Sequence, residues 1–354
     1  MRSLGVSCLA LVGALCAGAF PSPAFAQTAS NGGAQVPART LPVPDTVSPQ
    51  EQKLIAAPLR TGWDVLPKTG EEWKPVSEAG AAGTIRNLPG LTERLKVKYE
   101  KTTIDGVRAF VVTPEQIAPE NQNRVLLHMH GGCYVLNGGE AGLPEALMMS
   151  AFAKAKVVSV DYRMPPEAYF PAALDDGMTV WKSLLKNTPA RNIGIFGTSA
   201  GGALALEMVL KAKQDGVPMP GAIAPGTPMS DVTKTGDTFY TNELVDNVLV
   251  SRDGFCDAGA KVYAKGHDLK DPLLSPVYGD MQGFPPAILT SGTRDLLLSN
   301  TVRVHRKLRQ AGIEATLQVF EGQSHAHYIR DDTSPETREV FAEIAQFFDR
   351  HMSK

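Results

Sequence analysis

The stretch IGIFGTSAGGALAL, residues 193–206, decides the fold. An apolar run of strand type stops at Ser199, which has a glycine two positions before it and two positions after it, and an apolar pattern of helical period then begins. The pattern G-x-S-x-G at 197–201 is typical of a sharp strand-to-helix turn, in which small residues let the two elements approach and the serine takes a strained conformation at the tip. The serine hydroxyl would then lie at the carboxyl edge of a sheet, beside a helix N-terminus that favours an anion. An ordinary glycine-rich turn is the alternative that this stretch alone leaves open.

Short apolar segments alternate with helical segments along most of the chain. Strands are predicted at 125–129, 157–160, 193–196, 222–224, 287–289 and 316–320, and helices at 143–153, 171–186, 200–214, 299–310 and 335–351. Ahead of them, residues 94–101 and 107–113 flank Asp105-Gly106 and predict a hairpin. The alternation predicts an α/β fold, with a mostly parallel sheet of about eight strands and helices on both faces. Residues 229–275 break the alternation and predict an insertion above the sheet.

The first 26 residues are typical of a secretory signal peptide. Arg2 supplies a basic start, residues 4–20 form an almost charge-free apolar run, and Ala24-Phe25-Ala26 forms a cleavage site with small residues at its first and last positions. The apolar run is shorter than the roughly 20 residues that a membrane-spanning helix needs. We therefore expect cleavage after Ala26 and export to the periplasm or the medium, without stable membrane insertion; a permanent N-terminal anchor is the alternative.

The remaining chain has the organisation expected of one large domain. Residues 27–48 are rich in Pro, Ala, Gly and Thr and are expected to form a flexible leader. The sequence SPQE at 48–51 combines a cap residue, a proline at the first helical position and a glutamate at the third, so it predicts a helix start, with short helices from there to about residue 92. No linker or internal repeat interrupts the later chain, and residues 49–354 are predicted to form a single domain.

Composition and charge exclude several classes of protein. The formal net charge of −2 gives no basic surplus with which to bind nucleic acid. The histidines lack the spacing of metal ligands and no dinucleotide-binding fingerprint is present, so neither a metal nor a cofactor is expected. Cys133 and Cys256 remain after signal cleavage; export permits a disulfide between them, but the sequence leaves open whether they are bridged or free.

A second glycine-rich segment, HGGC at 130–133, follows the predicted strand at 125–129. Consecutive glycines let the backbone curl so that its N–H groups face inward, and the oxyanion of acyl transfer needs two or three such donors, each worth about 100- to 1000-fold in rate. A plain Gly-Gly turn is the alternative. We expect His130 to brace this loop and His128 to lie in the core or behind the site. The candidate oxyanion donors are the N–H groups of Gly131, Gly132, Cys133 and Ala200.

Two late loops supply the partners that a nucleophilic serine requires. The strand at 287–289 runs into a loop that contains Asp295, and the strand at 316–320 runs into a loop that contains His325. A serine nucleophile needs a base, and the base needs an orienting carboxylate. Because all three side chains follow predicted parallel strands, they can converge on one edge of the sheet in the order Ser199, Asp295, His325. His325 is preferred to His327 as the base because it lies nearer the end of its strand; a surface-loop aspartate is the alternative for position 295.

Six blocks in order resemble the hormone-sensitive-lipase-like branch of the α/β-hydrolases, a group of bacterial carboxylesterases, over nearly all of residues 95–350. They are HGG at 130–132, DYRMPPE at 161–167, GTSAGG at 197–202, DPLLSP at 271–276, Asp295 and GQSH at 322–325. The resemblance implies the α/β-hydrolase fold, with Ser199 as nucleophile, Asp295 as orienting acid and His325 as base. It also implies a helical cap from about 49–90 and 229–270. Five aromatic side chains there either line an apolar substrate pocket or pack the cap onto the core: Trp63, Trp73, Phe239, Tyr240 and Phe255.

Three positions depart from the family's pattern. Cys133 stands where a third glycine is usual, which keeps a backbone donor but adds a side chain at the floor of the site. Thr198 stands where an acidic residue is common, so the hydrogen bonds behind the nucleophile are expected to change more than the nucleophile itself. His327 replaces an aromatic residue that often follows the base by two positions.

The expected function is hydrolysis of small-molecule carboxylic esters, with short to medium acyl chains, through an acyl-enzyme. Lactone or carbohydrate-ester hydrolysis by the same triad is the alternative, and a non-catalytic binding protein on this fold is a further one. The natural substrate, the stereochemical preference and the oligomeric state are not encoded in any pattern that we identify in the sequence.

Overall fold

The computed structural model describes residues 27–28 and 33–352 of the 354-residue chain. The chain divides into two compact units, residues 1–42 and 43–354. In the first unit, β1 (Gln27–Thr28) pairs antiparallel with β2 (Ala34–Gln35). All other elements of the described residues, and the candidate site, lie in the second unit. The predicted signal peptide, residues 1–26, falls outside the described residues.

An eight-stranded sheet forms the centre of the second unit, as the sequence predicts. Its strands are β3 (Val97–Ile104), β4 (Val107–Pro114), β5 (Val125–Met129), β6 (Val157–Val160), β7 (Ile193–Thr198), β8 (Ala222–Gly226), β9 (Ala287–Gly292) and β10 (Ala315–Phe320). They follow the order β10-β9-β8-β7-β5-β6-β4-β3, in which β4 pairs antiparallel with β3 and β6 and the other neighbouring strands pair parallel. The carboxyl ends of β5, β7, β8, β9 and β10 therefore meet at one edge of the sheet.

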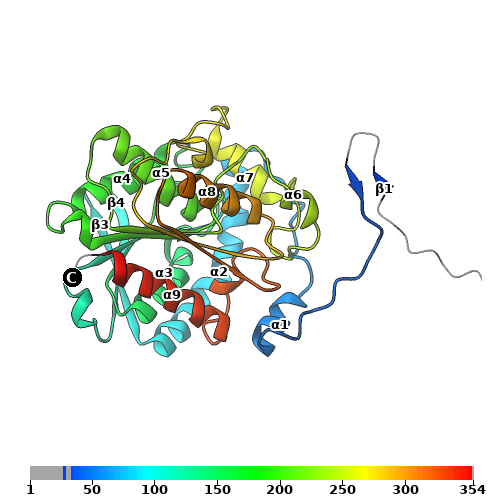
Figure 1. The fold of residues 1–354 in the computed structure, drawn as a ribbon. Helices are drawn as coiled ribbons and strands as arrows, with labels where there is room; N and C mark the ends of the chain where they lie inside the picture. Colours follow the sequence, from blue (N-terminus) through cyan, green and yellow to red (C-terminus); the bar gives the residue numbers. More distant parts are fainter. Residues whose placement is uncertain (1–26, 29–32, 353–354) are drawn as a thin grey trace, which may run out of the picture. The chain divides into compact units, whose positions relative to one another are not determined.

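Helices cover both faces of the sheet, which confirms the predicted layers (Figure 1). One face carries α3 (Leu143–Ala153) and α9 (Pro335–His351), and the other carries α4 (Ala172–Leu184), α5 (Ala200–Asp215) and α8 (Leu298–Gln310). Side chains of a strand point alternately to the two faces. In β5, accordingly, Leu126 belongs to the hydrophobic cluster beneath α3 and α9, whereas Leu127 and Met129 belong to the cluster on the opposite face.

The N-terminal part of the second unit contains one long helix where short helices are expected. α1 (Pro49–Ile55) begins as predicted, with the Ser48 hydroxyl accepting the N–H of Glu51. α2 (Gly70–Leu95) has 26 residues, so the prediction of short helices alone was wrong. Pro75 and Pro89 lie inside α2, and each removes one backbone hydrogen bond. The helix continues through both because packing, here of the buried Trp73 and Leu88, supplies most helical stability in proteins.

The first strand of the hairpin starts later than predicted. The expected segment was 94–101, whereas β3 is Val97–Ile104, because α2 continues to Leu95. Ile104 faces Val107 across Asp105 and Gly106, which both take positive φ. Such a turn matches the twist of the flanking strands, and so the turn itself was correctly predicted.

The insertion at residues 229–275 contains the short helices α6 (Thr238–Thr241) and α7 (Phe255–Ala264), and α7 packs against α2. Single 3-10 turns occur at Pro119–Asn121, Gly139–Gly142, Ala190–Asn192, Pro276–Tyr278 and His327–Ile329. Within the described residues, no helix combines the length and the apolar character needed to cross a bilayer.

Candidate active site

Ser199 occupies the tip of a tight turn between β7 and α5. Its backbone has φ 64° and ψ −122°, a region that residues other than glycine rarely adopt. The flanking glycines explain how the turn fits: a Cβ added to Gly197 would lie 2.2 Å from the carbonyl oxygen of Met129, and one added to Gly201 would lie 1.9 Å from it. Neither position can therefore carry a side chain, and the end of β5 packs directly on the turn.

The loop after β5 packs against this turn. A Cβ on Gly131 would lie 2.6 Å from the carbonyl oxygen of Thr198, and Gly132 has φ 124°, so both positions require glycine. In the described part of the chain, the N–H groups of Gly131, Gly132 and Cys133 donate to no other residue, and the N–H of Ala200 opens α5 without a helical partner. The four candidate donors thus lie in two adjoining backbone segments, and each is available to a ligand.

Cys133 and Cys256 form a disulfide, with their Cα atoms 5.2 Å apart. The sequence leaves open whether these two cysteines are bridged or free, and the structure shows that they are bridged. The bridge joins the glycine-rich loop to α7, so the side chain that departs from the usual glycine attaches the loop covalently to the insertion above the sheet.

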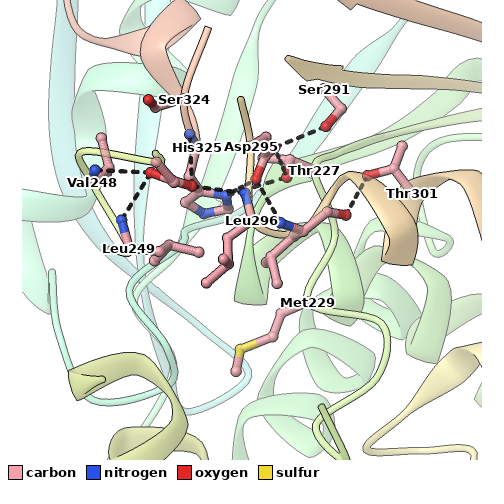
Figure 2. Close-up of polar contacts among 12 residues, drawn as sticks. Thr227, Met229, Val248, Leu249, Ser291, Asp295, Leu296, Thr301, Ser324 and His325 are labelled. Carbon is pink, nitrogen blue, oxygen red and sulfur yellow. Dashed lines mark hydrogen bonds and ion pairs between the residues drawn. The ribbon is translucent and has the colours of Figure 1, made fainter. Parts of the chain in front are cut away.

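Asp295 and His325 contact each other through their side chains, as Figure 2 shows. His325 Nδ1 lies 3.1 Å from Asp295 Oδ1, and both side chains are buried. The other carboxylate oxygen accepts hydrogen bonds from the hydroxyls of Thr227 and Ser291, and the N–H of Leu297 donates to Oδ1 at 2.8 Å. A carboxylate at Nδ1 fixes the proton on that nitrogen, so Nε2 is left as the hydrogen-bond acceptor of the ring.

Charge and hydrogen bonding keep Asp295 ionised. Burial opposes ionisation, but the nearby His325 and the hydrogen bonds from His325, Thr227 and the N–H of Leu297 outweigh it, so the pKa of Asp295 lies below its ordinary value. The residue at position 295 is therefore not a surface-loop aspartate. It has no exposed area, and three different segments hold its carboxylate.

Asp246 is a buried carboxylate that sequence reasoning missed. It accepts the N–H groups of Val248 and Leu249 from its own loop, of Leu296 at 2.8 Å and of His325 at 3.3 Å. Burial and the negative charge of Asp295 raise its pKa, although His325 acts in the opposite direction. Asp246 thus connects the backbone beside Asp295 to the backbone of His325. No motif surrounds it in the sequence, because all its partners are N–H groups brought together by folding.

His327 lies apart from Asp295 and binds a different carboxylate. Its Nδ1 is 2.9 Å from Glu51 Oε1, and its Nε2 is 3.0 Å from Asn247 Oδ1. The Asn247 amide donates to the carbonyls of Leu54 and Ala57, which orients its oxygen toward the imidazole. His327 and Asn247 therefore attach α1 to the loop that carries His325. The geometry supports the preference for His325 as the base.

A polar network lies behind the nucleophile turn. The Thr198 hydroxyl donates to Glu145 Oε1 at 2.7 Å and contacts the Tyr328 hydroxyl at 2.7 Å. Glu145 Oε2 in turn lies 3.2 Å from His128 Nε2, and His128 Nδ1 lies 2.9 Å from the Ser159 hydroxyl. His128 is therefore a buried support of the network, in keeping with the expectation for it.

His130 braces the glycine-rich loop. Its Nδ1 lies 2.8 Å from the carbonyl oxygen of Gly131, and its ring stacks on Tyr162 with 4.0 Å between the ring centroids. The Tyr162 hydroxyl donates to the His130 carbonyl at 2.7 Å. Burial lowers the pKa of His130 to about 4, and nearby His128 adds to this, whereas the Gly131 carbonyl and Asp161 oppose it. The ring is therefore neutral at neutral pH.

One cavity of about 1050 Å³ contains both Ser199 and His325 in its wall, together with Gly131, Gly132 and Cys133. Of the five aromatic residues proposed for it, Phe255 alone lines this cavity. Trp73 and Phe239 are buried in the hydrophobic core, Trp63 packs against that core, and Tyr240 is 65% exposed. For these four, the pocket-lining alternative was wrong. The apolar wall comes instead from aliphatic side chains: Leu54, Leu88, Leu91, Leu136, Met148 and Leu249.

Among the described residues, no group of three or more His, Cys, Asp or Glu side chains is arranged to hold a metal ion. The groups that converge at this edge of the sheet are instead a hydroxyl, an imidazole, a carboxylate and unpaired N–H groups. These are the parts needed for nucleophilic acyl transfer.

Known proteins share this fold and much of this sequence. A family described as alpha/beta hydrolase fold matches residues 126–329. An esterase of Acinetobacter venetianus is 30% identical over 260 residues, which are 72% of this chain and 84% of the esterase. An acetyl-hydrolase of Streptomyces hygroscopicus is 29% identical over 238 residues, 67% of this chain and 79% of that protein. The crystal structure of esterase E25 matches with a TM-score of 0.87 and 44% identity, over 90% of this chain and 99% of E25.

The chain therefore belongs to the α/β-hydrolase fold family, in its branch of hormone-sensitive-lipase-like carboxylesterases. It is accordingly a serine hydrolase that cleaves esters.

Proposed function

We propose that this carboxylesterase uses Ser199 as nucleophile, His325 as general base and Asp295 as the acid that orients the base. The observation that carries the proposal is the 3.1 Å contact between His325 Nδ1 and Asp295 Oδ1, in a histidine that lines the same cavity as the strained Ser199. With the proton held on Nδ1, the lone pair of Nε2 is left to accept the proton of the serine hydroxyl.

The reaction proceeds in two acyl-transfer steps. His325 takes the proton of Ser199 as Oγ attacks the ester carbonyl, and the resulting imidazolium gives that proton to the departing alcohol. Water then attacks the acyl-enzyme with His325 again as base, and the acid leaves while Ser199 regains its proton. The ionised Asp295 stabilises the imidazolium in both steps, and its low pKa keeps it from taking the proton itself.

The oxyanion of each tetrahedral intermediate binds backbone N–H groups of Gly131, Gly132, Cys133 and Ala200. Two features support this assignment: these groups have no hydrogen-bond partner among the described residues, and Gly131 packs against the backbone of Thr198 beside the nucleophile. Ala200 also opens α5, whose N-terminal dipole favours a negative charge.

The substrates are small-molecule esters with short to medium acyl chains. A cavity of about 1050 Å³ with an aliphatic wall can accept such chains, since ligand pockets of small molecules commonly measure about 300–1000 Å³. Rates across a series of p-nitrophenyl esters from acetate to laurate test this, with a few lactones included. A maximum at the long end of the series, or faster lactone hydrolysis, would reject the proposed chain length or the ester preference.

Replacement of Ser199 by alanine tests the nucleophile. We expect kcat on p-nitrophenyl butyrate to fall by about 10⁴-fold or more, with an unchanged melting temperature. Ser183→Ala, on α4 and outside the cavity, is the matched control and should retain wild-type kinetics. Turnover that survives Ser199→Ala would reject the serine mechanism.

We also propose export, with cleavage after Ala26. The sequence pattern of residues 1–26 supports it, and the Cys133–Cys256 disulfide adds independent support, because such bonds persist mainly in oxidising compartments. Fractionation of cells that produce the full chain, followed by N-terminal sequencing, tests the proposal. We expect a periplasmic or secreted protein that starts at Gln27; a cytoplasmic protein that retains Met1 would reject it.

A further inference from the structure

The wall of the catalytic cavity contains arginine side chains whose positive charge is not paired with a carboxylate. Four arginines line it, and of these Arg94 forms an ion pair with Asp332, at 2.7 and 3.0 Å. In the part of the chain that the structure describes, no ion pair joins Arg60, Arg86 or Arg330 to a carboxylate. The whole protein has a formal net charge of −2, so this surplus is a local property of the cavity.

The carboxylates of the cavity wall are already engaged. Asp332 pairs with Arg94, and Glu145 accepts from Thr198 and contacts His128. Asp246 lies close enough to act on Arg330, but its two oxygens already accept four backbone N–H groups. Among the described residues, neither Arg60 nor Arg330 is thus paired with a carboxylate, although the charge of Asp246 acts on Arg330.

Arg60 and Arg330 both line the cavity, and the positive charge of Arg60 acts on Arg330. The guanidinium of Arg60 lies over the ring of Phe255, 4.2 Å from its centre, and Phe255 also lines the cavity. Arg330 follows the turn His327–Ile329 and is exposed by surface area, although neighbouring groups displace part of the water around its guanidinium. This desolvation lowers the pKa of Arg330, and the positive charge of Arg60 adds to the effect. Two such cations would both be stabilised by one shared anion.

We propose that the preferred substrates of this esterase are esters that carry a second, anionic group, a carboxylate, which binds between Arg60 and Arg330 while Ser199 attacks the ester carbonyl. The inference rests on the proposed triad and adds the substrate class. A planar guanidinium pairs with a carboxylate through two parallel hydrogen bonds, which supplies both affinity and orientation. The anionic group belongs either to the acyl part or to the alcohol part of the ester.

Matched pairs of esters test the proposal and separate the two cases. For the alcohol part, 4-acetoxybenzoate is compared with 4-acetoxybenzamide; for the acyl part, ethyl hydrogen glutarate is compared with ethyl glutaramate. Each pair differs only by a carboxylate in place of an amide of similar shape. We expect the carboxylate ester of at least one pair to have a kcat/KM about 10- to 100-fold higher than its amide partner, and the pair that responds identifies the part that carries the anion.

Variants connect that preference to the two arginines. Arg60→Gln and Arg330→Gln should each lower the carboxylate-to-amide ratio by about tenfold, and Arg330→Lys should restore part of it. Arg191→Gln is the matched control, because Arg191 is exposed and lies outside the cavity, and it should leave the ratio unchanged. In wild type, 0.5 M NaCl should reduce the ratio, since salt screens the attraction.

The proposal is overturned if both wild-type ratios are near or below one, or if neither glutamine variant changes them. The first result does not depend on whether a variant folds, because it is measured on the wild-type enzyme. Ser199→Ala separates this outcome from failure of the triad: wild-type activity on p-nitrophenyl butyrate that disappears in Ser199→Ala, together with flat ratios, rejects only the anionic substrate class.

Discussion

Thr198 and Glu145 meet directly behind the nucleophile turn, with 2.7 Å between the threonine hydroxyl and the glutamate Oε1. The family resemblance of the sequence implies an acidic residue at the position of Thr198. Here the carboxylate behind the turn comes from α3 instead, and the hydroxyl of Thr198 connects it to the elbow. Tyr328 joins the same hydroxyl at 2.7 Å, so one small side chain satisfies two larger buried groups.

Thr198→Val should therefore lower stability more than turnover. The valine leaves Glu145 and Tyr328 without their shared partner inside the protein, which should reduce the free energy of unfolding by about 2–4 kcal/mol. We expect kcat to change by less than about tenfold, because the hydroxyl bonds Glu145 and Tyr328 and not His325. Urea denaturation and steady-state kinetics measure the two effects. Thr198→Ser keeps the hydroxyl and should stay within about 1 kcal/mol of wild type; equal losses in both variants would contradict this explanation.

His325→Ala and His327→Ala should separate chemistry from stability. Loss of His325 removes the base, so kcat should fall by about 10⁴-fold or more with little change in unfolding. Loss of His327 leaves the buried Glu51 without its ring partner and should cost about 3–5 kcal/mol of stability, while most of the turnover of the folded fraction remains. Steady-state kinetics and urea denaturation of each variant at 15 °C measure the predicted changes in kcat and in the free energy of unfolding. Collapse of turnover in His327→Ala alone would reverse the assignment of the base.

His130 should make the stability of the protein depend on pH. Its folded pKa of about 4 lies below the ordinary value of 6.5, so the unfolded chain takes up a proton as the pH falls below about 6.5 while the folded chain does not. The contribution is thus fully present above pH 6.5 and is lost progressively toward pH 4, by roughly 3 kcal/mol in all. Other groups titrate in the same range, so the comparison is with His130→Gln, whose unfolding free energy between pH 7 and 4.5 should fall less steeply. Parallel curves for the two proteins would show that His130 does not contribute in this way.

The disulfide should support both stability and catalysis. It closes a loop with a sequence separation of 123 residues, and removal of such a bond typically costs about 2–5 kcal/mol. Because Cys133 belongs to the loop of proposed oxyanion donors, Cys256→Ala should also lower kcat on p-nitrophenyl butyrate by about tenfold or more through a less fixed loop. Melting curves with and without a reductant give the matched comparison: the reductant should destabilise wild type and leave Cys256→Ala unchanged. If kcat is equal in wild type and in Cys256→Ala, the disulfide contributes to stability but not to catalysis.

The sequence was sufficient for the layers and for the edge of the sheet at which the site lies. Buried parallel strands form continuous apolar runs, and each run ends where its loop begins, so Ser199, Asp295 and His325 could be placed after β7, β9 and β10 from local pattern alone. The start of α1 after Ser48 could also be predicted from local sequence, because the cap residue and the proline that follows it act within one helical turn.

Features that depend on distant partners were not predictable. Glu51 and His327 are separated by 276 residues, and their contact exists only because α1 folds over the loop of His325. Asp246 has backbone partners from three segments, which no side-chain motif records. The length of α2 was underestimated because two prolines indicate breaks locally, whereas burial of Trp73 and Leu88 supports the helix through them.

The residues around the start of α1 have a practical consequence for any shortened or N-terminally fused version of this enzyme. The N–H and hydroxyl of Ser48 bind Glu336 of α9 at 2.7 and 2.6 Å, and Glu51 reaches His327 and Gln323 on either side of His325. A protease that clips the chain before this point would leave these tethers intact, whereas a cut only a few residues later would release the support of the proposed base. Loss of turnover would then precede any visible loss of secondary structure, and the boundary for safe trimming lies ahead of Ser48.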